Sequence, residues 1–600
     1  MATTVKKCAC GRVCQTAVLA GWFLSGIATD VPGGVPQLEA VMDHDPELPE
    51  QPVVRSVPPR SKQLWIEALS GPEEDLWRET ATAILRAHQQ GFPELEDSAP
   101  HLLRVFAVCQ HAGARLTIAA ALIELDARQA AGPLFERAQG GGTDEAQIIE
   151  PALARWDHPP ARDVWLRRLT DPAITRQRLL LAIDGLRTVK DLRAAPLLRN
   201  LAIDRSFAAG IRLPAARALS ELQSDGLFDD AARLSADRSP RALVDRLVAV
   251  SLLSSHRGDE AEQLLRQLAL DEQAAVAVIA LRRLLEIDPE LIHPLVETLL
   301  TNTDAGVRRL AAQSLADRPS VPVFETLGGL LNDPHPDVRR SVRQSLLELA
   351  ARPEFDGVIR TKAMHVLAAD DWRGQEQSAH LLGELDHKPA ASRLVKLLYS
   401  DRAEVYVTAA WSLRKLAVRD VLPDMFAFTR DVAEQYVDVQ ESSPPPNLSA
   451  GYDACLSHLF QAFGLMRYAE PEPILLAFIP RRYDLGPRSR GAAAWAVGFL
   501  HENDPQRELM LLLGYRVADA GEIPFPEPIE LRANAAISLG RMNAVPALEA
   551  LRHVYGQNPP GHRVREACSW AIERITGEDL TDPEPKNLVP LTEFLQPLGR

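Results

Sequence analysis

Cysteine and aromatic residues are scarce in this chain of 600 residues. It contains 6 cysteines, and aromatic side chains make up 6% of its residues. So few cysteines exclude a scaffold held together by disulfide bonds. The shortage of aromatic residues argues against a β-sandwich, which needs them together with β-branched residues. Alanine, leucine and arginine are frequent instead, and this composition favours helices.

Positive charge is also in short supply. Lys and Arg number 66 against 81 Asp and Glu, which gives a net charge of −15. This balance argues against a protein that coats nucleic acid or an anionic membrane. Hydrophobic residues at 46% and charged residues at 24% are typical of a folded globular protein. Length alone would predict roughly four domains.

Three of the cysteines, Cys8, Cys10 and Cys14, lie close together near the start of the sequence. Thiolates bind Zn²⁺ well, but no further Cys or His follows before His44 to complete a zinc site. The uncharged run over residues 15–28, with basic residues before it, has the pattern of a secretory signal or short anchor. A short buried helix is the third interpretation. An exported or membrane-anchored location is favoured over a cytoplasmic one, and membrane contact is expected only through this segment.

An internal repeat runs through most of the chain. Its marker is an Asp or Asn that follows a leucine-rich stretch and precedes an apolar residue and an Arg at the start of an alanine-rich helix. The marker positions are separated by 33, 33, 34, 31, 31, 37 and 31 residues. We expect the marker side chain to cap the helix that follows. Two short helices per unit bury their apolar faces only by stacking on neighbouring units, so the sequence predicts an all-α solenoid. The markers are Asp171, Asp204, Asp237, Asp271, Asn302, Asp333, Asp370 and Asp401.

This pattern resembles the HEAT repeat, and in particular the short bacterial HEAT-like repeats of the phycobilisome-lyase type. The resemblance rests on the Asp-Pro-x-x-x-Val-Arg run at 333–339 and on the related stretches 302–308, 532–536 and 565–572. It implies a superhelix of antiparallel helix pairs in which Asp and Arg side chains pair between neighbouring units. Asp271 is followed by no Arg, and we expect the ladder of pairs to be interrupted there. The implied ladder residues are Asp171, Arg176, Asn302, Arg308, Asp333 and Arg339.

Composition and the repeat together divide the chain into segments. Two proline-rich interruptions near residues 441–447 and 523–528 separate a long array from a short one. The expected segments are a cysteine-rich or signal-like stretch at 1–30, a proline-rich linker at 31–60, a repeat array at 61–420, a divergent loop-bearing helical segment at 421–530, C-terminal repeats at 531–580 and a tail at 581–600.

Catalytic and cofactor motifs are absent from the sequence. It has no P-loop, dinucleotide glycine fingerprint, His-Glu-x-x-His or nucleophile elbow, so we expect no catalytic residue and no cofactor. His380, Glu384 and His387 have a spacing that places them on one helical face, and such side chains can bind Zn²⁺. Residues 386–389 have the composition of a turn, however, and an exposed polar face is the simpler interpretation.

A basic stretch follows residue 480. Its guanidinium groups suit a carboxylate or phosphate, and its tyrosine can stack on a ligand. A solvated loop, or pairing with Asp484 and Glu502, is the simpler interpretation. The candidate contact residues for an anion or a partner are Arg481, Arg482, Tyr483, Arg488 and Arg490.

These observations favour a non-catalytic scaffold for protein–protein interaction. A solenoid presents a long concave face, and we expect the second helix of each unit to form it. Those helices carry charges of both signs, for example at Arg193 and Arg199, Glu262 and Arg266, Arg393 and Lys396, and Glu549 and Arg552. The expected partner is therefore a protein or peptide on the concave face, and no nucleic acid is expected. The alternative, implied by the resemblance alone, is a lyase-type enzyme subunit that handles a tetrapyrrole or another small ligand.

Overall fold

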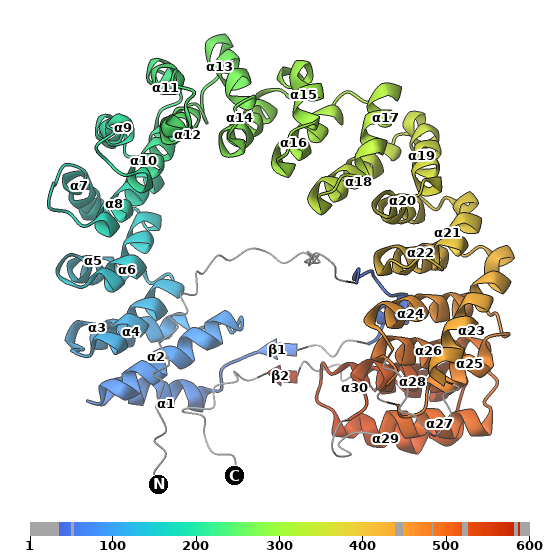
Figure 1. Ribbon diagram of the computed structural model, residues 1–600. Helices are drawn as coiled ribbons and strands as arrows, with labels where there is room; N and C mark the ends of the chain where they lie inside the picture. Colours follow the sequence, from blue (N-terminus) through green and yellow to red (C-terminus); the bar gives the residue numbers. More distant parts are fainter. Residues whose placement is uncertain are drawn as a thin grey trace, which may run out of the picture.

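Stacked helix pairs form a single curved array in the computed structural model, which describes residues 35–49, 53–437, 448–482, 484–518, 526–580 and 586–588. Helices α1 to α30 follow one another around an arc whose two ends approach each other (Figure 1). The predicted all-α solenoid is confirmed. Among the described residues, no helix combines the length and the apolar character needed to cross a membrane.

The helices form an outer and an inner row (Figure 1). Successive inner helices contact one another along the whole arc, and each inner helix packs on an outer one. The array opens with α1 (Pro59–Ser70). The outer row then contains α3 (Ala99–Val108), α5 (Ala131–Gly140), α7 (Pro159–Arg168), α9 (Ala195–Ile203), α11 (Phe228–Ser235), α13 (Asp259–Ala269), α15 (Val296–Leu300), α17 (Val321–Leu330), α19 (Pro353–Ala368), α21 (Ala391–Leu397), α23 (Leu422–Val437), α25 (Glu472–Phe478), α27 (Arg507–Ala518) and α29 (Leu548–Gln557).

The inner row lines the hollow of the arc (Figure 1). It continues without a break through residues 421–530, the segment that the sequence marks as divergent. The inner helices are α2 (Glu74–Gln89), α4 (Ala112–Glu124), α6 (Thr143–Arg155), α8 (Arg176–Thr188), α10 (Ala209–Leu222), α12 (Leu243–Leu252), α14 (Ala274–Ile287), α16 (Ala305–Leu315), α18 (Pro336–Ala350), α20 (Trp372–Glu384), α22 (Ala403–Leu416), α24 (Ala450–Leu465), α26 (Pro487–Leu500), α28 (Ile529–Arg541) and α30 (Arg563–Thr576).

In six of the eight repeats, the Asp or Asn marker forms a turn instead of the predicted helix cap. In the unit before α18, the Asp333 carboxylate accepts a hydrogen bond from the backbone N–H of His335 at 2.8 Å, and α18 begins one residue later. Asn302 binds the N–H of Asp304 in the same way, and Asp304 itself caps α16. The marker therefore belongs to an Asx turn two residues before the cap, which reverses the chain between outer and inner helix. The same bond recurs at Asp171, Asp204, Asp237 and Asp271.

Small residues allow the last inner helices to approach one another closely. A Cβ built on Gly498 in α26 would lie 2.8 Å from the Cα of Ser538 in α28. A Cβ on Gly540 in α28 would lie 2.8 Å from the Cα of Ala571 in α30. Real side chains do not reach such distances, so glycine is required at these two helix crossings.

Two clusters of buried apolar side chains run through the array. One includes residues between Val57 and Ala311, and the other those between Ala312 and Ile572. The boundary falls inside α16. The second cluster also includes Ala40 and Met42, which lie at a 3-10 turn (Val41–Asp43) that precedes α1 in sequence.

Two short strands lie in the opening between the ends of the arc (Figure 1). Strand β1 (Val53–Arg55) pairs in parallel with β2 (Lys586–Leu588), with Val54 opposite Asn587. The first strand leads into α1, and the second lies beyond the last helix in the segment predicted to be a tail. The pair therefore joins a strand before α1 to a strand after α30, at the point where the arc would otherwise be open.

Candidate functional site

The segment of residues 35–49, which contains one 3-10 turn at Val41–Asp43, lies along the inner row at the C-terminal end of the arc. In Figure 1 it is the dark blue stretch against the orange helices. The sequence places these residues in a linker at 31–60. In the structure, α22, α24, α26, α28 and α30 each contribute a side chain that contacts residues 35–49. We call this surface the inner groove, and define it by Arg414, Gln461, Trp495, Arg541 and Arg563.

Main-chain atoms of the segment make most of its polar contacts with the groove. Arg414 of α22 donates from Nη2 to the carbonyl of Glu39 at 2.8 Å. The indole Nε1 of Trp495 in α26 donates to the carbonyl of Asp45 at 2.8 Å. Groups that bind a peptide backbone hold an extended chain in place without depending on its side chains.

Met42 is the residue that the groove holds most completely. Its backbone N–H donates to Oε1 of Gln461 in α24 at 3.3 Å, and its carbonyl accepts from Nη2 of Arg563 in α30 at 2.8 Å. The other nitrogen of that guanidinium, Nη1, donates to the carbonyl of Asp43 at 2.7 Å. The side chain of Met42 is 2% exposed and belongs to the apolar core. Met42 therefore anchors the segment through both its backbone and its side chain.

A hydrogen bond within its own helix orients the side chain of Gln461. Its Nε2 donates to the carbonyl of Ser457 at 3.0 Å, one helical turn earlier, so its Oε1 faces the groove. That oxygen also accepts from Nη1 of Arg414 at 3.0 Å. One amide thus connects α22, α24 and the segment.

Asp45 provides a side-chain contact of opposite charge. Its carboxylate forms an ion pair with Arg541 of α28. The guanidinium of Arg541 lies 3.8 Å from the ring centre of Phe499 and 5.0 Å from that of Trp495. Two aromatic faces and a carboxylate therefore surround a cation whose side chain is 6% exposed.

The electrostatics of the groove favour an acidic ligand. Burial lowers the pKa of Arg414 to about 10, and the nearby charges of Glu39 and Asp43 partly oppose that shift. Burial likewise lowers the pKa of Arg541 to about 10, opposed by Asp45. Both arginines stay charged at neutral pH, and buried cations require a compensating negative charge. Residues 35–49 contain four Asp or Glu and no Lys or Arg.

Arg308 and Asp333, two of the implied ladder residues, pair between neighbouring units. Arg308 in α16 donates from Nε and Nη2 to the two carboxylate oxygens of Asp333 in the next unit, both at 2.7 Å. Burial acts to raise the pKa of Asp333, but the bonds from Arg308 and from the backbone of His335 lower it overall. Nη1 of Arg308 also binds the carbonyl of Asn302 at 2.8 Å, so one side chain joins the turn before its helix to the next unit.

The other implied ladder residues are placed differently. Arg339 binds the carbonyl of Asp333 at 2.9 Å and lies 3.7 Å from Glu376. Arg176 and Asp171 are exposed, and they are not the ladder pair of their unit. Arg178 takes that place instead.

Arg178, two residues along the same helix as Arg176, lies 3.0 Å from a carboxylate oxygen of Glu150 in the preceding unit. It also donates to the carbonyl of Gly141 at 2.8 Å. The resemblance identified the type of interaction in this unit and selected the wrong arginine.

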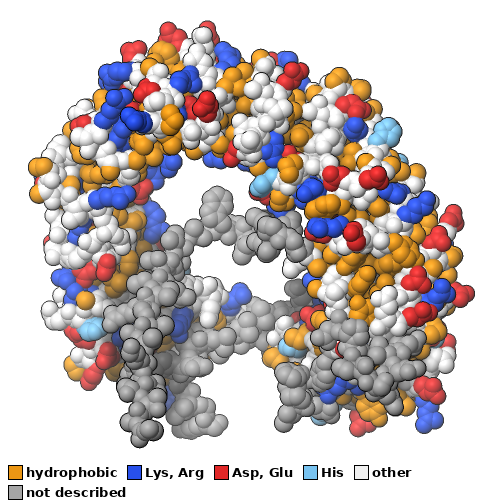
Figure 2. Space-filling model, viewed as in Figure 1, with side chains coloured by type: hydrophobic (Ala, Val, Ile, Leu, Met, Phe, Trp, Pro, Cys, Tyr) orange, Lys and Arg blue, Asp and Glu red, His pale blue; other side chains and the backbone are white. Residues whose placement is uncertain are grey.

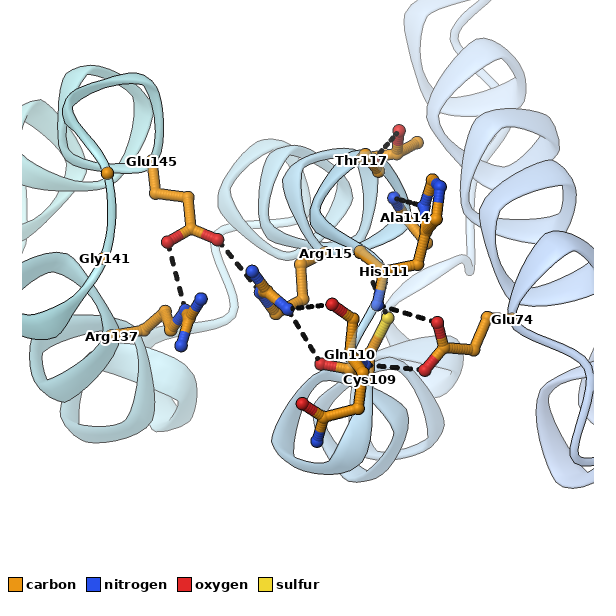
Figure 3. A network of polar contacts seen from close by, with 12 residues as sticks. Glu74, Cys109, Gln110, His111, Ala114, Arg115, Thr117, Arg137, Gly141 and Glu145 are labelled. Carbon is orange, nitrogen blue, oxygen red and sulfur yellow. Dashed lines mark hydrogen bonds and ion pairs between the residues drawn. The ribbon is translucent and has the colours of Figure 1, made fainter.

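The same arrangement recurs in units for which no pair of residues was predicted. Figure 3 shows Arg115 of α4 between the carbonyls of Cys109 and Gln110 on one side and Glu145 of the next inner helix on the other. Asp271, where an interruption was predicted, pairs with Arg246 at 2.8 Å. That prediction is wrong because the partner precedes Asp271 in the chain. Further pairs are Arg212 with Asp245 and Arg490 with Glu527.

The basic stretch after residue 480 is neutralised by carboxylates. Arg490 donates to both oxygens of Glu527 at 2.7 and 2.9 Å and is buried. Arg481 lies 4.0 Å from the same carboxylate, and Arg482 pairs with Asp484. Arg488 is exposed. Three of these arginines therefore lie close to carboxylates of the chain itself. Tyr483, the remaining candidate, lies outside the described residues.

The three residues of the candidate metal site, His380, Glu384 and His387, have different surroundings. His380 stacks on Trp411 with ring centres 4.6 Å apart, and burial lowers its pKa to about 3. Glu384, the last residue of α20, pairs with Lys415 at 3.1 Å, and His387 follows the helix end. In the described part of the chain, no group of three or more His, Cys, Asp and Glu is arranged to hold a metal ion. Cys8, Cys10 and Cys14 lie outside that part.

The helices expected to line the concave face lie on the other side of the array. Helices α9, α13 and α21, which correspond to the second helices in the sequence, belong to the outer row (Figure 1). The helices that open each predicted unit form the inner row. Figure 2 shows positive and negative side chains interspersed along the arc, with neither sign gathered on one stretch of the visible face.

Comparison with known proteins supports the repeat class. A family model for HEAT repeats matches residues 261–348. A search of curated proteins gave no match. A solved structure of Kap95p with RanGDP is similar over 86% of this chain and 72% of its own length, with 12% identity and a TM-score of 0.50. A Kap95:Nup1 complex has the same coverage and identity and a TM-score of 0.49.

Kap121p bound to Pho4p is similar over 86% of this chain and 57% of its own length, with 11% identity and a TM-score of 0.44. The likeness to Kap95p shows the fold, a solenoid of helical repeats. The comparisons support the HEAT-repeat part of the resemblance and do not extend to the phycobilisome-lyase type.

Proposed function

We propose that this protein is a non-catalytic scaffold whose inner surface binds extended segments of partner proteins. The observation that carries the proposal is the chain's own segment at 39–45, which five successive inner helices hold largely through its backbone. A row of helices that holds one linear segment in this way offers the same kind of contact elsewhere along its length.

The partner class follows from charge and fold. Inner-row charges of both signs and the net charge of −15 favour a protein over a polyanion. Kap95p, a solenoid of the same fold class, is seen with the protein RanGDP. The sequence also lacks the motifs of the common cofactor-dependent and hydrolytic enzymes, and a binding role requires none of them.

Photo-crosslinking from matched positions on the two rows tests the proposal. Gln313 in α16 and Gln344 in α18 are exposed on the inner row, and Gln263 and Gln267 in α13 are exposed on the outer row. Each is replaced in turn by a photoreactive phenylalanine in the full chain, expressed in its native host. We expect protein adducts from the two inner positions, and adducts confined to the outer positions would contradict the proposal. A visible chromophore bound to the purified protein would favour the tetrapyrrole alternative instead.

A further inference from the structure

We infer that the inner groove selects acidic linear segments in which an apolar residue is followed, three positions later, by an aspartate. Residues 39–45 are then an internal copy of that ligand, with Met42 and Asp45 at the two selective positions. This inference rests on the proposed function and makes its partner more specific. It is carried by the contacts of the groove and by their charge.

The apolar position is defined by the contacts of Met42. Gln461 and Arg563 bind its N–H and its carbonyl, so its side chain is fixed in direction and enters the core. An unbranched side chain fills such a site with few steric demands, whereas a charged one would be buried without a partner. A ligand therefore needs a large apolar residue at this position.

The acidic position is defined by Arg541. Its guanidinium is buried against Phe499 and Trp495, and the carboxylate of Asp45 is the negative group that faces it from the segment. Trp495 binds the carbonyl of the same residue and so sets its distance from Met42. A ligand with a neutral residue here would leave a buried cation without its ion pair, which is costly.

The internal copy competes with any external ligand. Residues 39–45 are joined to α1 through a short stretch that includes β1, so they remain near the groove when released. Tethers of this length give effective concentrations on the order of millimolar. The wild-type chain should therefore bind an external segment weakly, and weakening of the internal copy should expose the groove.

Fluorescence anisotropy with a labelled peptide of residues 35–49 tests these points. The protein is the full chain with Met42→Asp and Asp45→Arg, which we call the opened chain. We expect the opened chain to bind the peptide at least about tenfold more tightly than the wild-type chain does. Peptides with Met42→Asp or with Asp45→Asn should each lose about tenfold in affinity for the opened chain.

The matched control peptide carries Glu47→Gln, which removes the same charge at an exposed position. Its affinity should change less than about twofold. In the opened chain, the further substitution Arg541→Met keeps the packing against Phe499 and removes the charge. We expect it to abolish the preference for Asp over Asn at peptide position 45.

The outcomes separate this inference from the proposed function. Binding of all four peptides with equal affinity would overturn the selectivity and leave the scaffold proposal standing. Failure of the opened chain to bind the unmodified peptide would overturn the groove as an external site, whereas the scaffold proposal is judged by the crosslinks from α16 and α18. If the opened chain does not fold, as judged by circular dichroism, the milder chain with Asp45→Asn alone is used, and the same peptide series decides.

Discussion

One arginine in most inner helices connects three parts of the molecule. Its backbone lies at the fourth helical position, as Arg308 does in α16 and Arg490 does in α26. From there the guanidinium reaches carbonyls near the end of the preceding outer helix and a carboxylate of the neighbouring unit. These carbonyls have no partner within their own helix, so the arginine satisfies them and fixes the spacing of the units.

Loss of one partner of a buried pair should be costly. We expect Asp333→Asn to lower the free energy of unfolding by about 3 kcal/mol, because it leaves the buried Arg308 without its ion pair. Asp171→Asn is the matched control, since the exposed Asp171 forms the same Asx turn and Asn preserves that turn. The control should change stability by less than about 0.5 kcal/mol in urea unfolding. Equal losses in the two variants would contradict a structural role for the pair.

Two buried carboxylates also predict how stability depends on pH. Burial acts to raise the pKa of Glu527, but Arg490 and Arg516 lower it overall, and Arg308 has the same effect on Asp333. A pKa that is lower in the folded state means that the stabilisation is complete above the ordinary carboxyl range. It is lost as the pH falls through that range and toward the lower folded-state pKa. We expect the urea midpoint to fall steeply below about pH 4, and less steeply in Asp333→Asn.

The sequence predicted that Arg and carboxylate side chains pair between units, but it did not always identify the arginine that forms the pair. The pair of Arg308 and Asp333 follows from the motif that carries both residues. Arg176 and Arg178 both lie near the start of α8, and only the exact position of the helix cap, Thr175, decides which one reaches the preceding unit. A single sequence does not define helix starts to within one or two residues.

At the scale of the element, glycine sets the distance between inner helices. We expect Gly498→Ala to lower the free energy of unfolding by about 1–3 kcal/mol, because its Cβ would lie 2.8 Å from the Cα of Ser538. Gly514→Ala in the outer helix α27 is the control, since its Cβ would meet nothing within 4 Å. It should raise stability by about 0.5–1 kcal/mol through helix propensity alone. Similar effects of the two changes in urea unfolding would contradict close packing between α26 and α28.

The positions of the helices could be predicted from periodicity. Whether a helix belongs to the inner or the outer row could not. Both helices of a pair bury one apolar face, and this pattern is the same whether the other face looks inward or outward. One signal in the sequence was available. Residues 489–498 of α26 are small or apolar on nearly every side and are buried throughout, as expected of a helix with neighbours all around it.

At the scale of the whole molecule, residues 35–49 connect opposite ends of the arc. They lie on α22 to α30 and continue through β1 to α1 (Figure 1). We expect the opened chain, with Met42→Asp and Asp45→Arg, to have a larger radius of gyration in small-angle X-ray scattering, because solenoids flex when a crosslink between their ends is removed. A chain with Glu47→Arg, altered at an exposed position, should scatter as the wild type does. Identical scattering of all three chains would show that the segment does not hold the arc closed.

The groove could not be found from the sequence because its two sides are far apart in the chain. Glu39 and Arg414 are separated by 375 positions. A segment with a single 3-10 turn is too short to show helical periodicity, and its acidic and proline-rich composition is the same as that of a solvated linker. The acidic residues were visible in the sequence, but the buried arginines that face them were visible only in the fold.

Met42 and Arg563 are separated by 521 positions in the sequence. This separation has a consequence for synthesis of the chain. The segment leaves the ribosome before every helix of the array, and Arg563 in the last helix of its groove leaves 521 residues later. At ordinary rates of translation the interval is about 25–100 s. During that time the segment is exposed and available to other proteins, while its future site does not yet exist. When α28 and α30 emerge, their arginines meet an acidic ligand already present on the same nascent chain.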